Sequence, residues 1–191
     1  MKIIGDKEIG EEELAFLCKK RNHSAQKELY TRYATRVFML CYSFYHNHDD
    51  AFDLMHDIMV KVFMSIDQYN YVGEGSLYAW INRLARNLII DRIRKDSKKE
   101  SVTTEIIDDA DASVTEEASR DIPISVLKKI IQQLPTTKQL IFNLHCVEGL
   151  SHKDISSLLG ITEKASSSML SKAKKMLAKR INDYLNKKNR G

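Results

Sequence analysis

The chain has 191 residues, of which 43% are hydrophobic and 29% are charged, and its net charge is +4. No run of about 18 apolar residues occurs, so we expect no membrane span, and the first ten residues lack the apolar core of a secretory signal. The three cysteines are widely spaced and form no CxxC pair, which indicates neither a disulfide framework nor a cysteine zinc site. We therefore expect a cytoplasmic protein with reduced thiols.

Residues that break helices and mark turns are scarce, because the chain has only 7 glycines and 2 prolines. This composition favours an all-α fold. The charge is unevenly spread: residues 1–95 carry +1, residues 96–122 carry −6 and residues 123–191 carry +9. The acidic segment has too few apolar side chains to offset its ordering entropy. We predict two small helical domains, 1–95 and 123–191, joined by an acidic flexible linker over 96–122. An alternative is that this segment occupies a basic groove until a partner displaces it.

The first domain is predicted to contain helices over residues 11–20, 24–45, 48–66 and 77–95. In the third helix, a stripe with helical spacing is predicted to face the core: Phe52, Met55, Met59, Val62, Phe63 and Ile66. Asp53, His56, Asp57 and Val60 then form an acidic outer face. A simple solvated face is one interpretation, and a His/Asp metal or paired-carboxylate site is another, although no companion ligand set accompanies it.

The loop over residues 68–76 contains Tyr69, Asn70 and Tyr71, and we predict exposed aromatic rings there, with Ser76 as the cap of the next helix. At about 100° per residue, one side of that helix collects Leu77, Trp80, Ile81, Leu84, Ala85 and Leu88, and the other collects Arg83, Arg86, Asn87, Ile90 and Arg94. A row of positively charged side chains beside an aromatic loop is typical of a surface that binds single-stranded nucleic acid. On such a surface, bases stack on the rings and the positive groups follow the phosphates. Solubilising arginines over core aromatics are the alternative.

The second domain is predicted to begin with helices over residues 124–134 and 137–147, the latter with Val147 inward and closed by Gly149. Ser151 and Asp154 then have capping-box spacing before a short helix, Gly160 marks a tight turn, and Thr162 can cap a long basic helix. This order is typical of a helix-turn-helix, and the serines at 166–168 lie in the half that would enter a major groove. A chance helical hairpin is the alternative.

These features together resemble a bacterial sigma-70 family factor of the extracytoplasmic-function (ECF) group, which contains only the second and fourth sigma regions. The resemblance covers about residues 10–95 and 123–185. The sequence DDAFDLMHD is similar to region 2.2, with His56 and Asp57 replacing the usual Gln and Glu. It implies that six residues contact the clamp helices of the β′ subunit of core RNA polymerase: Asp50, Asp53, Leu54, His56, Asp57 and Val60.

The sequence GSLYAWINRLARNLIIDRIRK is similar to regions 2.3 and 2.4. The resemblance implies recognition of the minus-ten element, with a flipped base in a loop pocket, by Tyr69, Asn70, Tyr71, Trp80, Arg83, Arg86, Asn87 and Arg94. The helix-turn-helix is similar to region 4, which implies contacts to the minus-thirty-five duplex from Ser151, Glu163, Lys164, Ser167, Ser168, Met169 and Lys172. Compared with the common pattern, this recognition helix is poor in arginine.

The implied function is that of an alternative sigma factor, which binds core RNA polymerase and directs promoter-specific initiation. It has no catalytic residues of its own, and neither a cofactor nor a metal is expected. The implied partners are the β′ clamp helices and β flap of core RNA polymerase, promoter DNA and an anti-sigma factor. Two rivals remain at this point: a stand-alone regulator that binds an operator, and a helical adaptor or anti-sigma-like interaction protein.

Overall fold

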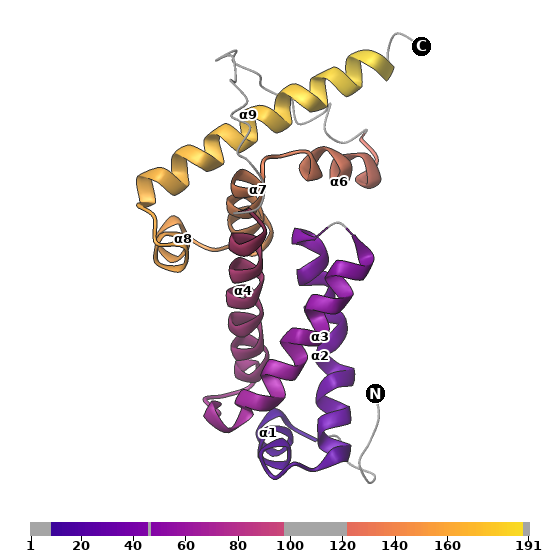
Figure 1. The fold of residues 1–191 in the computed structure, drawn as a ribbon, viewed down its shortest axis with the longest axis vertical. Coiled ribbons are helices and arrows are strands. Elements are labelled where there is room, and N and C mark those ends of the chain that lie inside the picture. Colours follow the sequence, from indigo (N-terminus) through magenta and orange to yellow (C-terminus); the bar gives the residue numbers. More distant parts are fainter. Residues whose placement is uncertain (1–8, 46, 98–121, 189–191) are drawn as a thin grey trace. The chain divides into compact units, whose positions relative to one another are not determined.

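The computed structural model describes residues 9–45, 47–97 and 122–188, and the chain divides into two compact units, residues 1–94 and 95–191. Every regular element of the described residues is helical, which confirms the predicted all-α fold (Figure 1). None of the described helices is long and apolar enough to cross a bilayer. Most of the segment predicted as an acidic linker, residues 98–121, lies outside the described residues.

Unit 1 contains α1 (Glu11–Lys19), α2 (His23–Phe44), α3 (His48–Ser65), a 3₁₀ turn η1 (Ile66–Gln68) and α4 (Ser76–Ser97). Local chemistry explains several of these boundaries. Three glutamates open α1 and a lysine closes it, as the helix dipole favours. Asn22 and Asn47 cap α2 and α3, since their side chains accept hydrogen bonds from the backbone N–H groups of Ala25 and Asp49.

The core of unit 1 forms where α2 packs against α1 and α3, and where α4 adds its apolar side. The fully buried side chains recur at helical spacing and include Leu14, Leu29, Ile58, Met59, Leu77, Ile81 and Ile89. Burial of a leucine- or isoleucine-sized side chain contributes about 1.5–3 kcal/mol, so these contacts make a large contribution to holding the helices together.

Phe52 of α3 and Ile90 of α4 do not lie on the helix sides predicted for them. Phe52 is 44% exposed, whereas Leu54 and Ile58, which were not in the predicted stripe, are buried. The stripe is turned because α3 packs its Ala51, Leu54 and Ile58 row inward, which leaves Phe52 at the edge against other rings. Ile90 is 2% exposed and belongs to the core rather than to the arginine side of α4.

Unit 2 contains α6 (Ile124–Gln132), α7 (Thr136–Phe142), a π-helical turn η2 (Asn143–Val147), α8 (His152–Leu159) and α9 (Glu163–Lys188). The long α9 is the scaffold, because α6, α7 and α8 all pack against it (Figure 1). Its buried side chains Ala173, Leu177 and Ile181 join Ile130 and Leu134 in one cluster.

The predicted helix over 137–147 does not continue as a regular α-helix. Its last turn widens, and the Glu148 N–H donates to the carbonyl of Asn143, five residues earlier, at 3.0 Å. The wider turn rotates the following side chains, so Val147 is 56% exposed rather than inward as predicted. Gly149 follows with φ +70°, in the left-handed cap conformation expected of it.

The inward row of α3 gives a stability prediction. Ile58→Ala should lower the free energy of unfolding of unit 1 by about 2–5 kcal/mol, because Ile58 is fully buried and its truncation leaves a cavity. Val60→Ala, two residues along the same helix and 57% exposed, should change it by less than about 0.5 kcal/mol. Urea denaturation followed by circular dichroism measures both. Equal losses for the two variants would contradict the observed orientation of α3.

Candidate nucleic-acid interface

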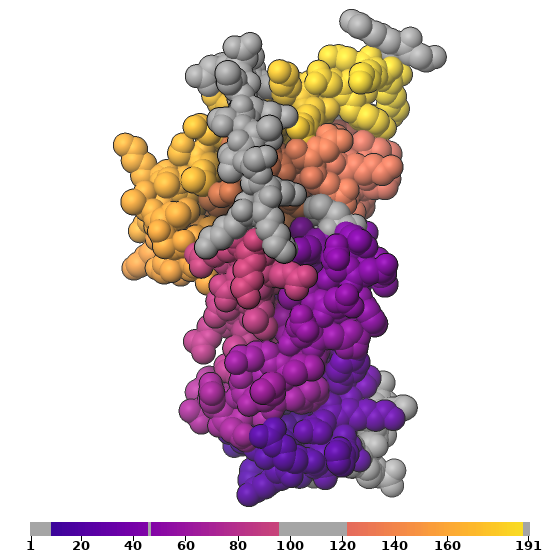
Figure 2. Space-filling model, viewed as in Figure 1, coloured from indigo at the N-terminus to yellow at the C-terminus, as the bar shows by residue number. Residues whose placement is uncertain are grey.

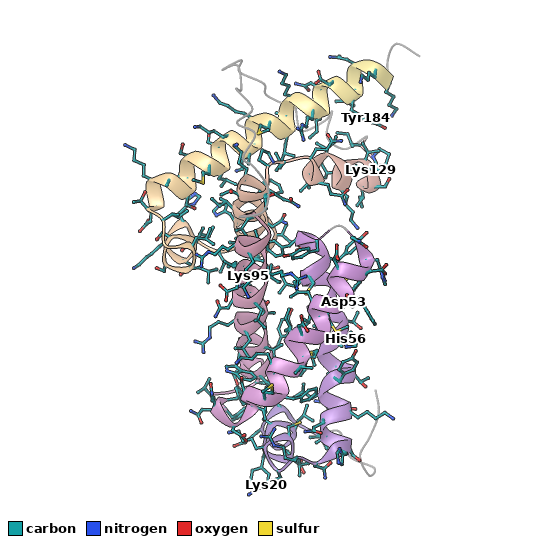
Figure 3. The ribbon with its side chains drawn as sticks, in the orientation of Figure 1. Lys20, Asp53, His56, Lys95, Lys129 and Tyr184 are labelled. Atoms are coloured by element: carbon teal, nitrogen blue, oxygen red, sulfur yellow. The ribbon has the colours of Figure 1, made fainter. Side chains whose placement is uncertain are left out.

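The outer face of α3 carries the acidic side chains that the sequence predicted. Asp50, Asp53, His56, Asp57 and Val60 are all exposed, and Figure 3 shows Asp53 and His56 about one turn apart on this helix. Leu54, in contrast, is 5% exposed and points into the core, because it lies about 100° around the helix from Asp53. Leu54 therefore supports this face from below and offers no contact surface of its own.

An apolar groove lies beside this acidic face, between α2 and α3. It has a volume of about 290 Å³ and is lined by Tyr30, Ala34, Thr35, Phe38, His48, Phe52 and Met55. The His56 ring packs edge to face against the Phe52 ring, with 4.5 Å between the ring centroids, and stacks on the Tyr30 ring, with 6.1 Å between the centroids. The groove was missed from the sequence because its aromatic residues, Phe52 above all, have the spacing of core residues. Acids next to exposed rings suit a partner helix that presents both basic and apolar side chains.

Tyr69 is buried, at 2% exposure, and the prediction of an exposed ring at this position is wrong. Its ring lies 5.5 Å from the ring of Trp80, and its hydroxyl forms a 2.6 Å hydrogen bond with the Ser76 Oγ atom. Burial raises the pKa of Tyr69, so the phenol stays protonated at neutral pH and keeps this bond. Tyr71, two residues along, is 38% exposed as predicted.

The loop and the first turns of α4 enclose an open pocket of about 460 Å³. Its lining residues are Gln68, Tyr69, Asn70, Val72, Ser76, Ala79, Trp80 and Arg83. Four of the predicted minus-ten residues, Tyr69, Asn70, Trp80 and Arg83, thus meet in one place, whereas Tyr71, Arg86, Asn87 and Arg94 do not line it. The pocket therefore combines an indole, two amides and a guanidinium, which are groups able to stack on, hydrogen-bond to and attract an unstacked nucleotide. Gln68 was missed, although its position inside the loop was a signal for it.

Farther along α4, three of the predicted side chains form a polar row. Arg83, Asn87 and Arg94 are exposed, and Arg86 is half-buried at the edge of the row. Arg94 lies 3.9 Å from the carboxylate of Asp91. The row is split by the buried Ile90, so it presents one cationic group at the pocket and another toward the end of the helix.

In unit 2, the predicted helix-turn-helix is built by its caps. Ser151 and Asp154 form the expected capping box, in which the Asp154 N–H donates to the Ser151 Oγ atom at 3.1 Å and the Ser151 N–H donates to the Asp154 carboxylate at 3.2 Å. Gly160 ends α8 at φ +68°, a conformation that favours glycine. Thr162 then caps α9 by accepting from the Ala165 N–H at 3.1 Å.

The first half of α9 presents most of the predicted minus-thirty-five residues on one exposed side: Glu163, Lys164, Ser167, Ser168 and Lys172. Figure 2 shows α9, coloured orange to yellow, at the surface of its unit. Met169 is half-buried at the edge of this side, and the Ser151 hydroxyl is engaged in the capping box. Ser171 was missed. Its helical position, about 40° from Ser167, places it on this side, and it is exposed.

Two family models match this chain: Sigma-70 region 2 over residues 29–99, and Sigma-70, region 4 over residues 125–177. The chain belongs to the sigma-70 family, in its ECF group. Among curated relatives, the ECF RNA polymerase sigma factor SigW of Bacillus subtilis is 24% identical, and the alignment covers 86% of this chain and 93% of the relative. SigM of the same organism is 23% identical, with 83% and 96% covered.

Two solved structures share the fold of this sigma factor. One is CnrH in complex with the cytosolic domain of CnrY, with a TM-score of 0.51 and 18% identity over 89% of this chain and 96% of that chain. The other is the sigma factor RpoE in complex with the anti-sigma factor NepR from Bartonella quintana, with a TM-score of 0.51 and 20% identity over 80% and 94%. The α3 face, the loop pocket and α4 all fall within region 2, and the helix-turn-helix falls within region 4.

A pair of histidines ties the helix-turn-helix of region 4 to the turn before it. The rings of His145 and His152 stack at 4.6 Å and are nearly parallel. The His145 Nδ1 atom is 2.8 Å from the Leu150 carbonyl and therefore carries the proton, because a carbonyl only accepts. The His152 Nδ1 atom is 2.9 Å from the Oγ atom of Ser166, which is fully buried. Ser166 therefore joins α8 to α9 and does not lie on the exposed side of α9.

The engaged hydroxyl of Ser151 predicts a structural effect. Ser151→Ala should lower the free energy of unfolding of the region 4 unit by about 1 kcal/mol, because the Asp154 N–H loses its acceptor. Ser151→Thr should retain most of the wild-type stability, because its hydroxyl can still accept. Ser168→Ala, an exposed serine on α9, should change it by less than about 0.5 kcal/mol. Thermal unfolding measures these changes. A loss of DNA affinity in Ser151→Ala with no loss of stability would instead assign the hydroxyl to DNA contact.

Proposed function

We propose that this sigma factor is an alternative sigma factor whose region 2 pocket holds one flipped base of the minus-ten element. The observation that carries the proposal is the pocket of about 460 Å³ where Trp80, Asn70 and Arg83 meet. A base that leaves the duplex loses stacking, and an aromatic wall restores part of it, which lowers the free energy of opening. The polymerase forms the phosphodiester bonds, and this chain supplies recognition without catalysis.

Core RNA polymerase is the proposed partner of the α3 face. The exposed Asp50, Asp53, His56, Asp57 and Val60 would meet the clamp helices of β′, and the neighbouring groove would accept an apolar side chain of the same partner. Charge complementarity at such a face raises the association rate and selects the partner, while the apolar groove contributes affinity. The β flap is the proposed partner of the region 4 unit.

Region 4 is proposed to read the minus-thirty-five duplex with the first half of α9. Serine hydroxyls and lysine ammonium groups are exposed together on that side, and such groups contact both phosphates and base edges in the major groove. Binding should weaken steeply with salt, because each lysine–phosphate contact releases a counterion. We further propose that residues 96–122 link the two domains, and that the protein works in the cytoplasm, where polymerase and promoter are.

An anti-sigma factor is the proposed regulator. Support comes from a neighbour of the same fold, RpoE, which was solved in complex with the anti-sigma factor NepR. An anti-sigma factor that covered the α3 face would compete with core polymerase for this sigma factor. The acidic segment 96–122 is an internal alternative for the same control.

The test of the proposed function is transcription in vitro. The purified chain is added to core RNA polymerase with total genomic DNA, and the 5′ ends of the transcripts are sequenced. We expect new discrete start sites that share two upstream motifs. If no new starts appear and core polymerase is still retained in a pull-down, an interaction protein is indicated. If core is not retained and duplex DNA is bound alone, a stand-alone regulator is indicated.

Promoter opening should depend on the cationic side of α4. The double variant Arg83→Ala with Arg86→Ala should reduce open-complex formation about tenfold or more while leaving affinity for core polymerase unchanged, because these side chains belong to α4, whereas the proposed core contacts belong to α3. Arg92→Ala is the matched control, since Arg92 lies about 180° around the helix from Arg83. Permanganate footprinting measures opening. Normal opening by the double variant would exclude this side of α4 from DNA contact.

Lys172 should contribute to minus-thirty-five recognition. If the Lys172 ammonium contacts a base, Lys172→Ala should weaken the binding free energy of the holoenzyme by about 1–3 kcal/mol on a promoter found in the transcription experiment. The same variant should have little effect on a promoter mutated at that base. A uniform loss across sequences, with a shallower salt dependence, would indicate a phosphate contact. Competition binding of holoenzyme to both promoters separates these outcomes, and Lys129→Ala, an exposed lysine of α6, is the control.

A further inference from the structure

Three side chains from α1 and the turn after it hold the loop that forms the region 2 pocket. They are Glu11, Lys19 and Arg21, and all three precede residue 29, where the match to region 2 begins. Arg21 contacts the segment just before the loop, Lys19 contacts Tyr69 at the beginning of the loop, and Glu11 contacts the first turn of the helix that follows. The conformation of a region 2 element therefore depends on residues outside that match.

Glu11 caps α4 from a distant part of the chain. Its side chain is buried, with 9% exposure of the residue, and its Oε2 atom accepts from the Leu77 N–H at 3.2 Å. The α4 helix has no local acceptor for this group: Gly75, at φ +84°, has no side chain, and the Ser76 hydroxyl donates back to the Gly73 carbonyl at 2.5 Å. A carboxylate at this end of a helix is also favoured by the helix dipole.

The same carboxylate is fixed by α2. The Tyr33 hydroxyl donates to the Glu11 Oε1 atom at 2.9 Å, and the Tyr33 ring stacks on Tyr78 of α4 at 6.0 Å. Burial, together with this hydrogen bond, raises the pKa of Tyr33 well above its ordinary value, so the phenol remains a donor at all physiological pH values. Glu11 therefore joins α1, α2 and α4 at one point.

Lys19 and Arg21 hold the beginning of the loop and the segment that leads into it. The Lys19 Nζ atom donates to the Tyr69 carbonyl at 2.5 Å. The Arg21 guanidinium donates to the Phe63 carbonyl at 2.9 Å and pairs with Asp67 at 2.8 Å. Arg21 itself has φ +59°, an unusual conformation for a residue other than glycine, which directs the chain from α1 into α2 beside this loop.

We infer that Glu11 and Lys19 are positioning residues for single-strand recognition. The pocket has one wall from the loop, Tyr69, and another from α4, Trp80 and Arg83. Lys19 fixes the first wall through the Tyr69 carbonyl, and Glu11 fixes the second through the start of α4. Neither residue lines the pocket or contacts a base. The inference rests on the proposed function, since it assumes that this pocket binds the flipped base.

The test is selection of sequence by the holoenzyme. Core polymerase loaded with the full chain is incubated with a randomised single-stranded DNA library, and bound molecules are sequenced. Wild type should enrich one base at one position. Glu11→Ala should reduce that enrichment about tenfold, as expected for the loss of a cap, while affinity for core polymerase is unchanged. Glu11→Gln should lose less than Glu11→Ala, because its amide oxygen can still accept from the Leu77 N–H.

Matched controls separate positioning from a general loss of structure. Glu12→Ala removes an exposed carboxylate from the same turn of α1, and Lys20→Met removes an exposed ammonium next to Lys19. Figure 3 shows Lys20 at the outer end of α1. Both should select as wild type does. If Glu11→Ala unfolds unit 1, Lys19→Met decides the question, because Lys19 is half-buried and its bond to the loop lies outside the core.

A second readout uses the free protein. Trp80 is the single tryptophan of the chain, so its emission reports on the pocket alone. Glu11→Ala and Lys19→Met should increase quenching by acrylamide, whereas Glu12→Ala and Lys20→Met should not. Unchanged quenching and unchanged enrichment in folded Glu11→Ala and Lys19→Met overturn the inference. Failure of wild type itself to enrich any sequence would instead overturn the proposed function of the pocket.

Discussion

The hydrogen bond between the Glu11 carboxylate and the Leu77 N–H ties α1 to the start of α4, and it constrains the loop between α3 and α4. A loop that must present free groups to a base has few groups left to cap the helix that follows. Here the Ser76 hydroxyl is directed into the loop, toward Gly73 and Tyr69, and Gly75 offers no side chain. The acceptor therefore comes from α1, and the loop keeps its open pocket without leaving the start of α4 unsatisfied.

In region 4, the backbone groups at the helix ends are satisfied by residues close in sequence. The capping box of α8, the left-handed Gly160 and the Thr162 cap of α9 follow one another within a few residues. Longer links are also present, among them the stacked His145 and His152 and the bond between His152 and Ser166. Under the proposed function, region 4 presents a helix to the regular surface of a duplex, whereas region 2 must present a shaped pocket to one unstacked base.

This difference explains what the sequence could predict. The caps at Ser151 and Gly160 and the exposed row Asp53, His56 and Asp57 follow from local spacing, and the structure contains all of them. The burial of Tyr69 and the role of Glu11 depend on partners 7 to 66 residues away. The exposure of Phe52 depends on which row of α3 packs against α2. Periodicity assigns a residue to a side of its own helix, but it contains no information on which distant helix covers that side. The burial of aromatic residues is the hardest to predict from sequence, because rings occur both in cores and on binding surfaces.

The two DNA surfaces also differ in the chemistry available for discrimination. The exposed side of α9 offers serine hydroxyls, which both donate and accept, and lysines, which act as mobile point charges. Such groups bind a duplex strongly at low salt but distinguish bases weakly compared with bidentate arginines. The region 2 pocket has a ring, Trp80, and amides at Gln68 and Asn70; under the proposed function, these would recognise the edge of one base. Under the proposed function, α9 therefore supplies mainly placement on the promoter, and the pocket held by Glu11 and Lys19 supplies the larger share of sequence selection.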